Sequence, residues 1–74
     1  MMTGTTSEVV LTVNGEVRRI PAPATAAGLL EHLGLDSHTV VVEVNRRIVR
    51  RPDLERTSLA NGDSVELVHF VGGG

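Results

Sequence analysis

The dipeptide Asn14-Gly15 is the feature that most constrains how this chain can fold. It separates two short runs, residues 8–13 and 16–20, in which apolar and polar side chains alternate as they do in strands. A two-residue hairpin turn of type I′ requires positive φ at both central positions, and Asn followed by Gly meets this requirement best. We therefore predict a β-hairpin over residues 8–20.

An amphipathic helix is predicted after the hairpin. Pro21 and Pro23 end the return strand, and Thr25 is a suitable N-cap. Apolar residues then recur at helical spacing, namely Ala26, Leu29, Leu30 and Leu33. Gly34 fits the residue that stops a helix. Gly28 costs ~1 kcal/mol relative to alanine inside a helix, and we interpret it as a site of close packing on a sheet.

The second half of the chain predicts further strands. The run at residues 40–44 is rich in valine and is expected to be a central strand, followed by a turn at residues 45–47 and a short edge strand at Ile48 and Val49. Residues 35–39 read as a connector, 53–58 as irregular chain or one helical turn, Leu59 as a core anchor and 61–63 as a turn.

This order of elements predicts the α+β class, with a mixed sheet and one helix packed across one of its faces. If the last strand pairs beside the first, as in a β-grasp domain, the two are parallel neighbours in the centre of the sheet. Periodicity alone does not decide that pairing. We expect a disordered leader at residues 1–7, the domain at residues 8–70 and a flexible glycine tail at residues 71–74.

The C-terminal stretch is a strand that leads into three successive glycines. Val65 and Leu67 are expected to face the core, which directs Val68 and Phe70 to the other side. A tail without side chains has nothing to pack on the body, so either its terminal carboxylate is the working group or it is an inert end.

Composition excludes several classes of function. The 74 residues make one small domain with no cysteine, and the net charge of −2 does not suggest nucleic-acid binding. With no membrane-length apolar run and no signal peptide, we expect a soluble, cytoplasmic monomer. No catalytic set is apparent, and His32, His38 and His69 are too scattered to predict a metal site. Arg46, Arg47, Arg50 and Arg51 read as a solvated turn or a patch that faces a partner.

Several of these segments together resemble the ubiquitin-like sulfur carriers of the ThiS/MoaD-like family. The matching segments are Val13-Asn14-Gly15-Glu16, the helix from Thr25 to Leu33, Val42 to Asn45, the turn Asn61-Gly62-Asp63 and the ending Val65 to Gly74. The last segment, with Val68-His69-Phe70-Val71-Gly72-Gly73-Gly74, is the most specific and favours the thiamin branch. The leader, the third glycine and the arginine-rich stretch depart from the family pattern.

The resemblance implies a carrier and not an enzyme. The carboxylate of Gly74 would be adenylated by an E1-like, ThiF-like enzyme, which would bind the ATP and Mg²⁺, so this chain would need no cofactor of its own. Sulfur from a cysteine desulfurase or rhodanese-type donor would convert the adenylate to a thiocarboxylate, which a ThiG-like thiazole synthase would use.

In this interpretation Gly73 and Gly74 are the C-terminal residues that are adenylated and carry the sulfur. Gly72 and Val71 lie in a narrow channel of the partner, so that the terminus reaches the partner's active site. Phe70, Val68 and His69 are candidate docking residues beside the tail. Three alternatives stay open: a carrier for molybdopterin or for tRNA or cysteine sulfuration, a ubiquitin-like module conjugated to other proteins, and a β-grasp domain with an inert tail.

Overall fold

The structure is a computed structural model that describes residues 7–70 of the chain. Its elements, in chain order, are β1 (Glu8–Val13), β2 (Glu16–Pro21), β3 (Ala24–Thr25), α1 (Ala26–Leu33), β4 (Val40–Val44), β5 (Arg47–Val49), the 3-10 helix η1 (Arg51–Arg56), β6 (Ser58–Leu59) and β7 (Ser64–His69). The expected leader, apart from Ser7, and the expected tail lie outside the described residues.

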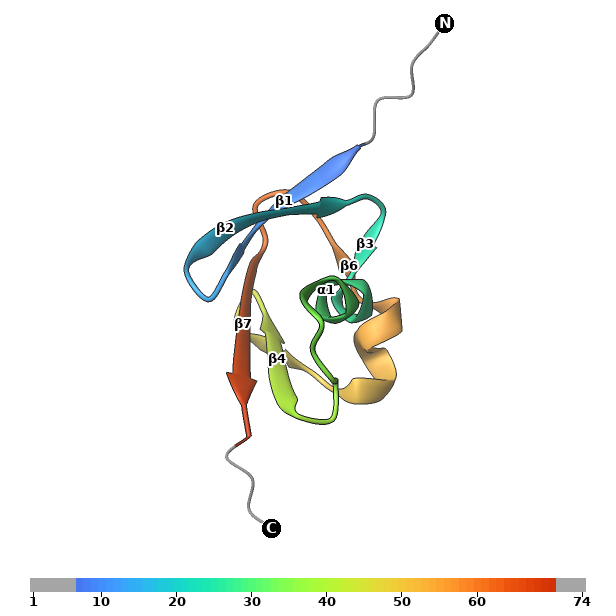
Figure 1. Ribbon diagram of the computed structural model, residues 1–74, viewed down its shortest axis with the longest axis vertical. Coiled ribbons are helices and arrows are strands. Elements are labelled where there is room, and N and C mark those ends of the chain that lie inside the picture. Colours follow the sequence, from blue (N-terminus) through green and yellow to red (C-terminus); the bar gives the residue numbers. More distant parts are fainter. Residues whose placement is uncertain (1–6, 71–74) are drawn as a thin grey trace, which may run out of the picture.

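The main sheet has the strand order β2-β1-β7-β4-β5. β7 is its central strand and runs parallel to β1, with Thr12 opposite Ser64 and Val13 opposite Val65. The other neighbouring pairs are antiparallel, so the sheet is mixed. In Figure 1 the twist of the sheet carries β1 and β2 across the top of the molecule, while β7 runs downward and the antiparallel β4 runs upward beside it. The predicted α+β class and β-grasp arrangement are confirmed.

The first hairpin forms where Asn14-Gly15 predicted it. φ is 50° at Asn14 and 83° at Gly15, and Val13 pairs with Glu16 across the turn. Both central residues therefore have the positive φ that a type I′ turn requires. The hairpin places Val9, Leu11 and Val13 on the buried face of β1.

Helix α1 has the predicted cap and stop. The Oγ1 atom of Thr25 accepts a hydrogen bond of 3.0 Å from the amide of Gly28, and Gly34 has a φ of 73°. The interpretation of Gly28 was wrong, because a Cβ built there would meet only Oγ1 of Thr25, at 3.3 Å, and no atom of the sheet within 4 Å. Gly28 lies beside its own N-cap.

One face of the sheet and the apolar side of α1 form the core. Leu29, Leu30 and Ala26 of the helix are buried, whereas Leu33 is only partly so. The main sheet contributes Val9, Leu11, Val13, Ile20, Val40, Val42, Val44, Val65 and Leu67, and the elements β3, η1 and β6 add Ala24, Leu54 and Leu59. No helix of residues 7–70 covers the opposite face of the sheet, as the position of α1 in Figure 1 shows.

Two further pairings complete the fold: the predicted short edge strand is β5, which begins one residue earlier than expected, at Arg47, whereas the β3–β6 pair was not predicted. β4 and β5 form a hairpin whose turn residues Asn45 and Arg46 have φ of 51° and 72°. β3 and β6 pair as a two-stranded sheet, with Ala24 opposite Leu59. The segment 53–58, left open as irregular or helical, overlaps the 3-10 helix η1, which begins two residues earlier, at Arg51, and has a proline in its first turn.

Candidate functional site at the end of the central strand

The last residues of β7 and Phe70 project alternately to the two faces of the sheet. Val65 and Leu67 are buried in the core, whereas the side chains of Val68 and Phe70 are 54% and 57% exposed. This alternation confirms the predicted directions of Val65, Leu67, Val68 and Phe70. The same alternation gives His69 the orientation of Val65 and Leu67, beyond the end of the core. His69 therefore lies on the opposite side of the chain from Val68 and Phe70.

The strand ladder holds the chain up to Phe70. The amide of Phe70 donates a hydrogen bond of 2.9 Å to the carbonyl oxygen of Thr39, which extends the β4–β7 pairing one residue past His69. The segment with the expected carrier chemistry therefore starts next to a fixed residue. Val71, Gly72, Gly73 and Gly74 lie outside the described residues, and their roles stay predictions.

The side chain of Asn14 continues the ladder where β1 ends. Its Nδ2 donates to the carbonyl oxygen of Leu67 at 3.1 Å, and its Oδ1 accepts from the amide of Leu67 at 2.7 Å. The carboxamide thus pairs with Leu67 as a further strand residue would. The sequence predicted the turn at Asn14 but not this contact, because its partner lies 53 positions away along the chain.

Two other asparagines form side-chain hydrogen bonds at the start of β7 and in the turn that precedes it. Oδ1 of Asn45 accepts from the amide of Ser64 at 2.9 Å, and its Nδ2 donates to Oδ1 of Asp63 at 3.0 Å. Oδ1 of Asn61 accepts from the amide of Val10 at 2.7 Å. The bonds of Asn45 join the turn after β4 to the start of β7, and the bond of Asn61 joins the turn before β7 to β1.

The helix-free face of the sheet is apolar near the tail. Val41 of β4 lies directly opposite Val68 of β7, and Ile48 of β5, on the same face, is 66% exposed. Two positions along the ladder, and so again on this face, Glu43 lies opposite Glu66. Neither carboxylate forms an ion pair with another described residue. We call Val41, Val68 and Phe70 the tail-side apolar face.

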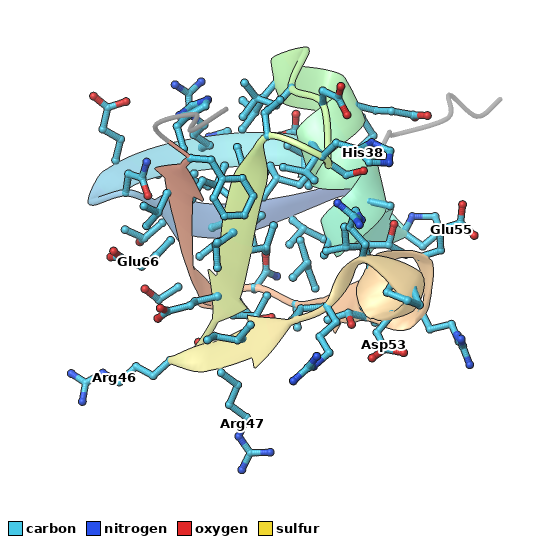
Figure 2. The ribbon with its side chains drawn as sticks, turned by 90° about the horizontal axis from the view of Figure 1, so that it is seen from below. His38, Arg46, Arg47, Asp53, Glu55 and Glu66 are labelled. Carbon is cyan, nitrogen blue, oxygen red and sulfur yellow. The ribbon has the colours of Figure 1, made fainter. Side chains whose placement is uncertain are left out.

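The four arginines around β5 are also unpaired within the described residues. Arg46, Arg47, Arg50 and Arg51 are exposed, and none has a nitrogen within 4.0 Å of a carboxylate oxygen of residues 7–70. Figure 2 shows Arg46 and Arg47 projecting away from the body at the β4–β5 turn.

The titratable groups in the described part of the chain are surface groups. Among residues 7–70 there is no cluster of three or more His, Cys, Asp or Glu that could hold a metal. Oδ1 of Asp36 lies 3.0 Å from Nδ1 of His38 and accepts a hydrogen bond of 2.8 Å from the amide of His38. That backbone hydrogen bond, followed by the contact with the ring, holds the pKa of Asp36 below its ordinary value. No helix of residues 7–70 is long and apolar enough to cross a membrane.

The arrangement is better suited to presenting the end of the chain to another protein than to catalysing a reaction. The central strand β7 is hydrogen-bonded to a neighbouring strand on each side, and its last residues lie at one end of the sheet, beside the tail-side apolar face. The family comparison decides which kind of protein is built in this way: the model described as the ThiS family matches residues 11–74. This chain belongs to the ThiS family.

Known relatives and solved structures agree with that assignment. The sulfur carrier protein ThiS of Bacillus subtilis is 35% identical over 66 residues, which cover 88% of this chain and all of the relative. The crystal structure of the thiamine biosynthesis protein ThiS from Geobacter metallireducens superposes with a TM-score of 0.76 at 32% identity. That superposition covers 89% of this chain and 100% of the Geobacter chain.

A longer relative shows the same segment in another context. A protein named thiazole synthase, from Paramagnetospirillum magneticum, is 42% identical over 64 residues. The match covers 86% of this chain but only 20% of that protein. This ThiS-family chain therefore spans about a fifth of the length of that relative.

Proposed function

We propose that this chain is a sulfur carrier that supplies sulfur for the thiazole ring of thiamin. The observation that carries the proposal is the match to the ThiS family, which extends through residue 74 and so includes the terminal glycines. The full-length correspondence with the Bacillus subtilis sulfur carrier supports it. The chain acts as a co-substrate, and other proteins perform the chemistry.

A carboxylate must be activated before sulfur can replace one of its oxygens. In the first step a carboxylate oxygen of Gly74 attacks the α-phosphorus of ATP, and pyrophosphate leaves. A sulfur nucleophile then attacks the acyl carbon and expels AMP, which leaves a thiocarboxylate on Gly74. ATP and Mg²⁺ would be bound by a ThiF-like adenylating enzyme, because this chain has no lysine and no phosphate-binding loop of its own.

The second partner is a thiazole synthase that accepts the sulfur. A protein named thiazole synthase contains a segment 42% identical to this chain, which supports a functional link between the two kinds of protein. A cysteine desulfurase or rhodanese-type protein would supply the sulfur. We expect the isolated chain to be a cytoplasmic monomer.

The tail and the tail-side apolar face would act together. Phe70 to Gly74, fully extended, spans roughly 17 Å, which allows the terminus to enter a buried site while the body stays outside. Gly72, Gly73 and Gly74 have no Cβ and suit a narrow channel, with Val71 at its entrance. Val68 and Phe70 would dock on the partner, and His69 would contact it from the other side of the strand.

Intact-protein mass spectrometry tests the carrier chemistry. The untagged chain would be incubated with ATP, the adenylating enzyme of the same source and a sulfide donor. We expect a mass gain of about 16 Da, because sulfur replaces one oxygen of the terminal carboxylate. The gain should be absent without ATP and in a chain that lacks Gly74. An unchanged mass with an adenylating enzyme that is active on another carrier would refute the proposal.

The sulfur acceptor needs a separate assay. The thiocarboxylate form would be mixed with thiazole synthase and its small-molecule substrates, and loss of sulfur from the chain would be followed by mass. Transfer of the sulfur in this mixture is expected. A thiocarboxylate that forms but is consumed only by a molybdopterin or tRNA sulfuration system would reassign the carrier to that pathway.

A further inference from the structure

We propose that the groove between β4, β5 and Phe70 binds an acidic, extended segment of the adenylating enzyme and so docks the carrier on it. This inference rests on the proposed function and assigns a role to two of the four arginines around β5. We define the β4–β5 groove by Val40, Val41, Ile48, Arg50, Arg51 and Phe70, which all line it. Its volume is about 420 Å³.

The groove exists because β5 is shorter than β4. β5 ends at Val49, which pairs with Val42, and the chain then turns away into η1. β4 reaches two residues further, to Val40. The first two residues of β4, Val40 and Val41, therefore have β7 on one side and the groove on the other.

The backbone of Val40 is oriented toward this groove. In the antiparallel ladder successive residues direct their N–H and C=O groups to alternate sides. Asn45 directs its amide toward β7, where it donates to Ser64, so the even-numbered residues of β4 direct theirs toward β5. No described residue pairs with Val40 on the β5 side. An extended partner segment could pair there by strand addition.

The charge of the groove fits an acidic occupant. Arg50 and Arg51 line it, no acidic side chain of residues 7–70 lines it, and neither arginine has an ion-pair partner among those residues. Val41, Ile48 and Phe70 supply an apolar wall that would accept one aliphatic or aromatic side chain from the same segment. Partners with complementary charge associate faster and in a defined orientation.

The groove adjoins the proposed docking surface. Val41 and Phe70 belong both to the groove and to the tail-side apolar face. A partner that covers this face to receive the tail would therefore reach Arg50 and Arg51 in the same encounter. Arg46 and Arg47 project away from the body at the turn (Figure 2) and do not line the groove, so they provide a matched control.

The test is the steady-state rate of adenylation as a function of carrier concentration. The variant R50E/R51E changes the charge by the same amount as the control R46E/R47E. We expect R50E/R51E to raise KM by about tenfold or more while kcat stays within about twofold, because only the encounter complex is weakened. The control should change KM by less than about threefold. High salt should raise the KM of the wild type more than that of R50E/R51E.

Other outcomes separate this inference from the proposed function. A wild-type chain that is never adenylated counts against the function itself. A normal wild type with an unchanged KM for R50E/R51E, or with equal increases for both pairs, would overturn the groove assignment. A lower KM for R50E/R51E would also overturn the assignment, because the two arginines would then hinder the encounter with the enzyme. Circular dichroism melting checks folding, and R50Q/R51Q replaces the reversal variant if that variant is unfolded.

Discussion

At the scale of single residues, polar side chains near the turns fix the path of the central strand. Asn14 is the clearest case, because its side chain bonds both backbone groups of Leu67 while its own φ of 50° closes the first hairpin. One residue therefore serves two parts of the fold. The turn was predictable from the dipeptide. The contact was not, since no sequence pattern links residue 14 to residue 67.

Replacing Asn14 with glycine separates these two roles. Glycine keeps the positive φ, so the turn should persist, but both hydrogen bonds to Leu67 are lost. We expect the free energy of unfolding to fall by about 1–2 kcal/mol. Denaturant unfolding measures that loss, and the amide of Leu67 should exchange faster with solvent. Asn14→Asp, which keeps the acceptor, should lie between the two. Unchanged exchange at Leu67 would contradict this role.

Asp36 predicts an acid dependence of stability. The hydrogen bond from the amide of His38, and then the contact with its ring, lower the pKa of Asp36 below the ordinary 3.8. Because the folded-state pKa is the lower one, the stabilisation is present above pH 3.8 and is lost as pH falls through the folded value. The melting temperature of Asp36→Asn should therefore vary less with pH across this range than that of the wild type. Parallel curves would exclude Asp36 as a source.

At the scale of elements, the sequence predicted what local patterns encode. The hairpin at Asn14-Gly15, the cap at Thr25, the stop at Gly34 and the strands at residues 40–44 and 65–68 carried clear signals. The β3–β6 pair did not, because two residues are too short to show a period. Local propensity also gave no reason for an arginine at positive φ in the second hairpin.

The helix cap offers a direct test of one predicted element. Thr25→Ala removes the oxygen that accepts from the amide of Gly28 and is expected to cost about 1 kcal/mol of unfolding free energy. Thr25→Ser keeps that oxygen and should be close to wild type. Denaturant unfolding of the three proteins gives the comparison. An equal loss in both variants would point to the methyl group of Thr25 instead of the cap.

The β4–β5 turn carries a residue that is poorly suited to it. The φ of 72° at Arg46 is the conformation that glycine adopts without strain. Arg46→Gly should therefore raise the free energy of unfolding by about 1 kcal/mol. Arg46→Ala removes the charge but keeps the strain, so it should change stability little. If alanine stabilises as much as glycine, the gain comes from relief of repulsion among the arginines.

At the scale of the whole molecule, one face of the sheet forms the core and stabilises the fold, while the other face is exposed and available to a partner. One face packs against α1, and the other carries the exposed Val17, Ile48, Val68 and Phe70. The alternation of the last strand predicted this separation for Val68 and Phe70. His69, the third candidate docking residue, lies on the other side of the strand, as the same alternation requires.

The substitution Phe70→Ala tests partner docking by the exposed face of the sheet without disturbing the core. The side chain is 57% exposed, so its loss should change the free energy of unfolding by less than about 1 kcal/mol. If Phe70 anchors the partner, the KM for adenylation should rise by about tenfold or more. Leu29→Ala, on the buried side, should instead cost about 2–5 kcal/mol. A normally folded Phe70→Ala chain that is adenylated with the wild-type KM would remove Phe70 from the docking surface.

The central position of β7 also has a consequence for biosynthesis. Of the strands that the structure describes, β7 is translated after all the others, and the two hairpins meet only through it. While the ribosome is still upstream of Ser64, the nascent chain has two hairpins that share no strand, so assembly of the sheet must wait for β7. Synthesis of the fold and of the segment that leads to the tail is thereby completed together.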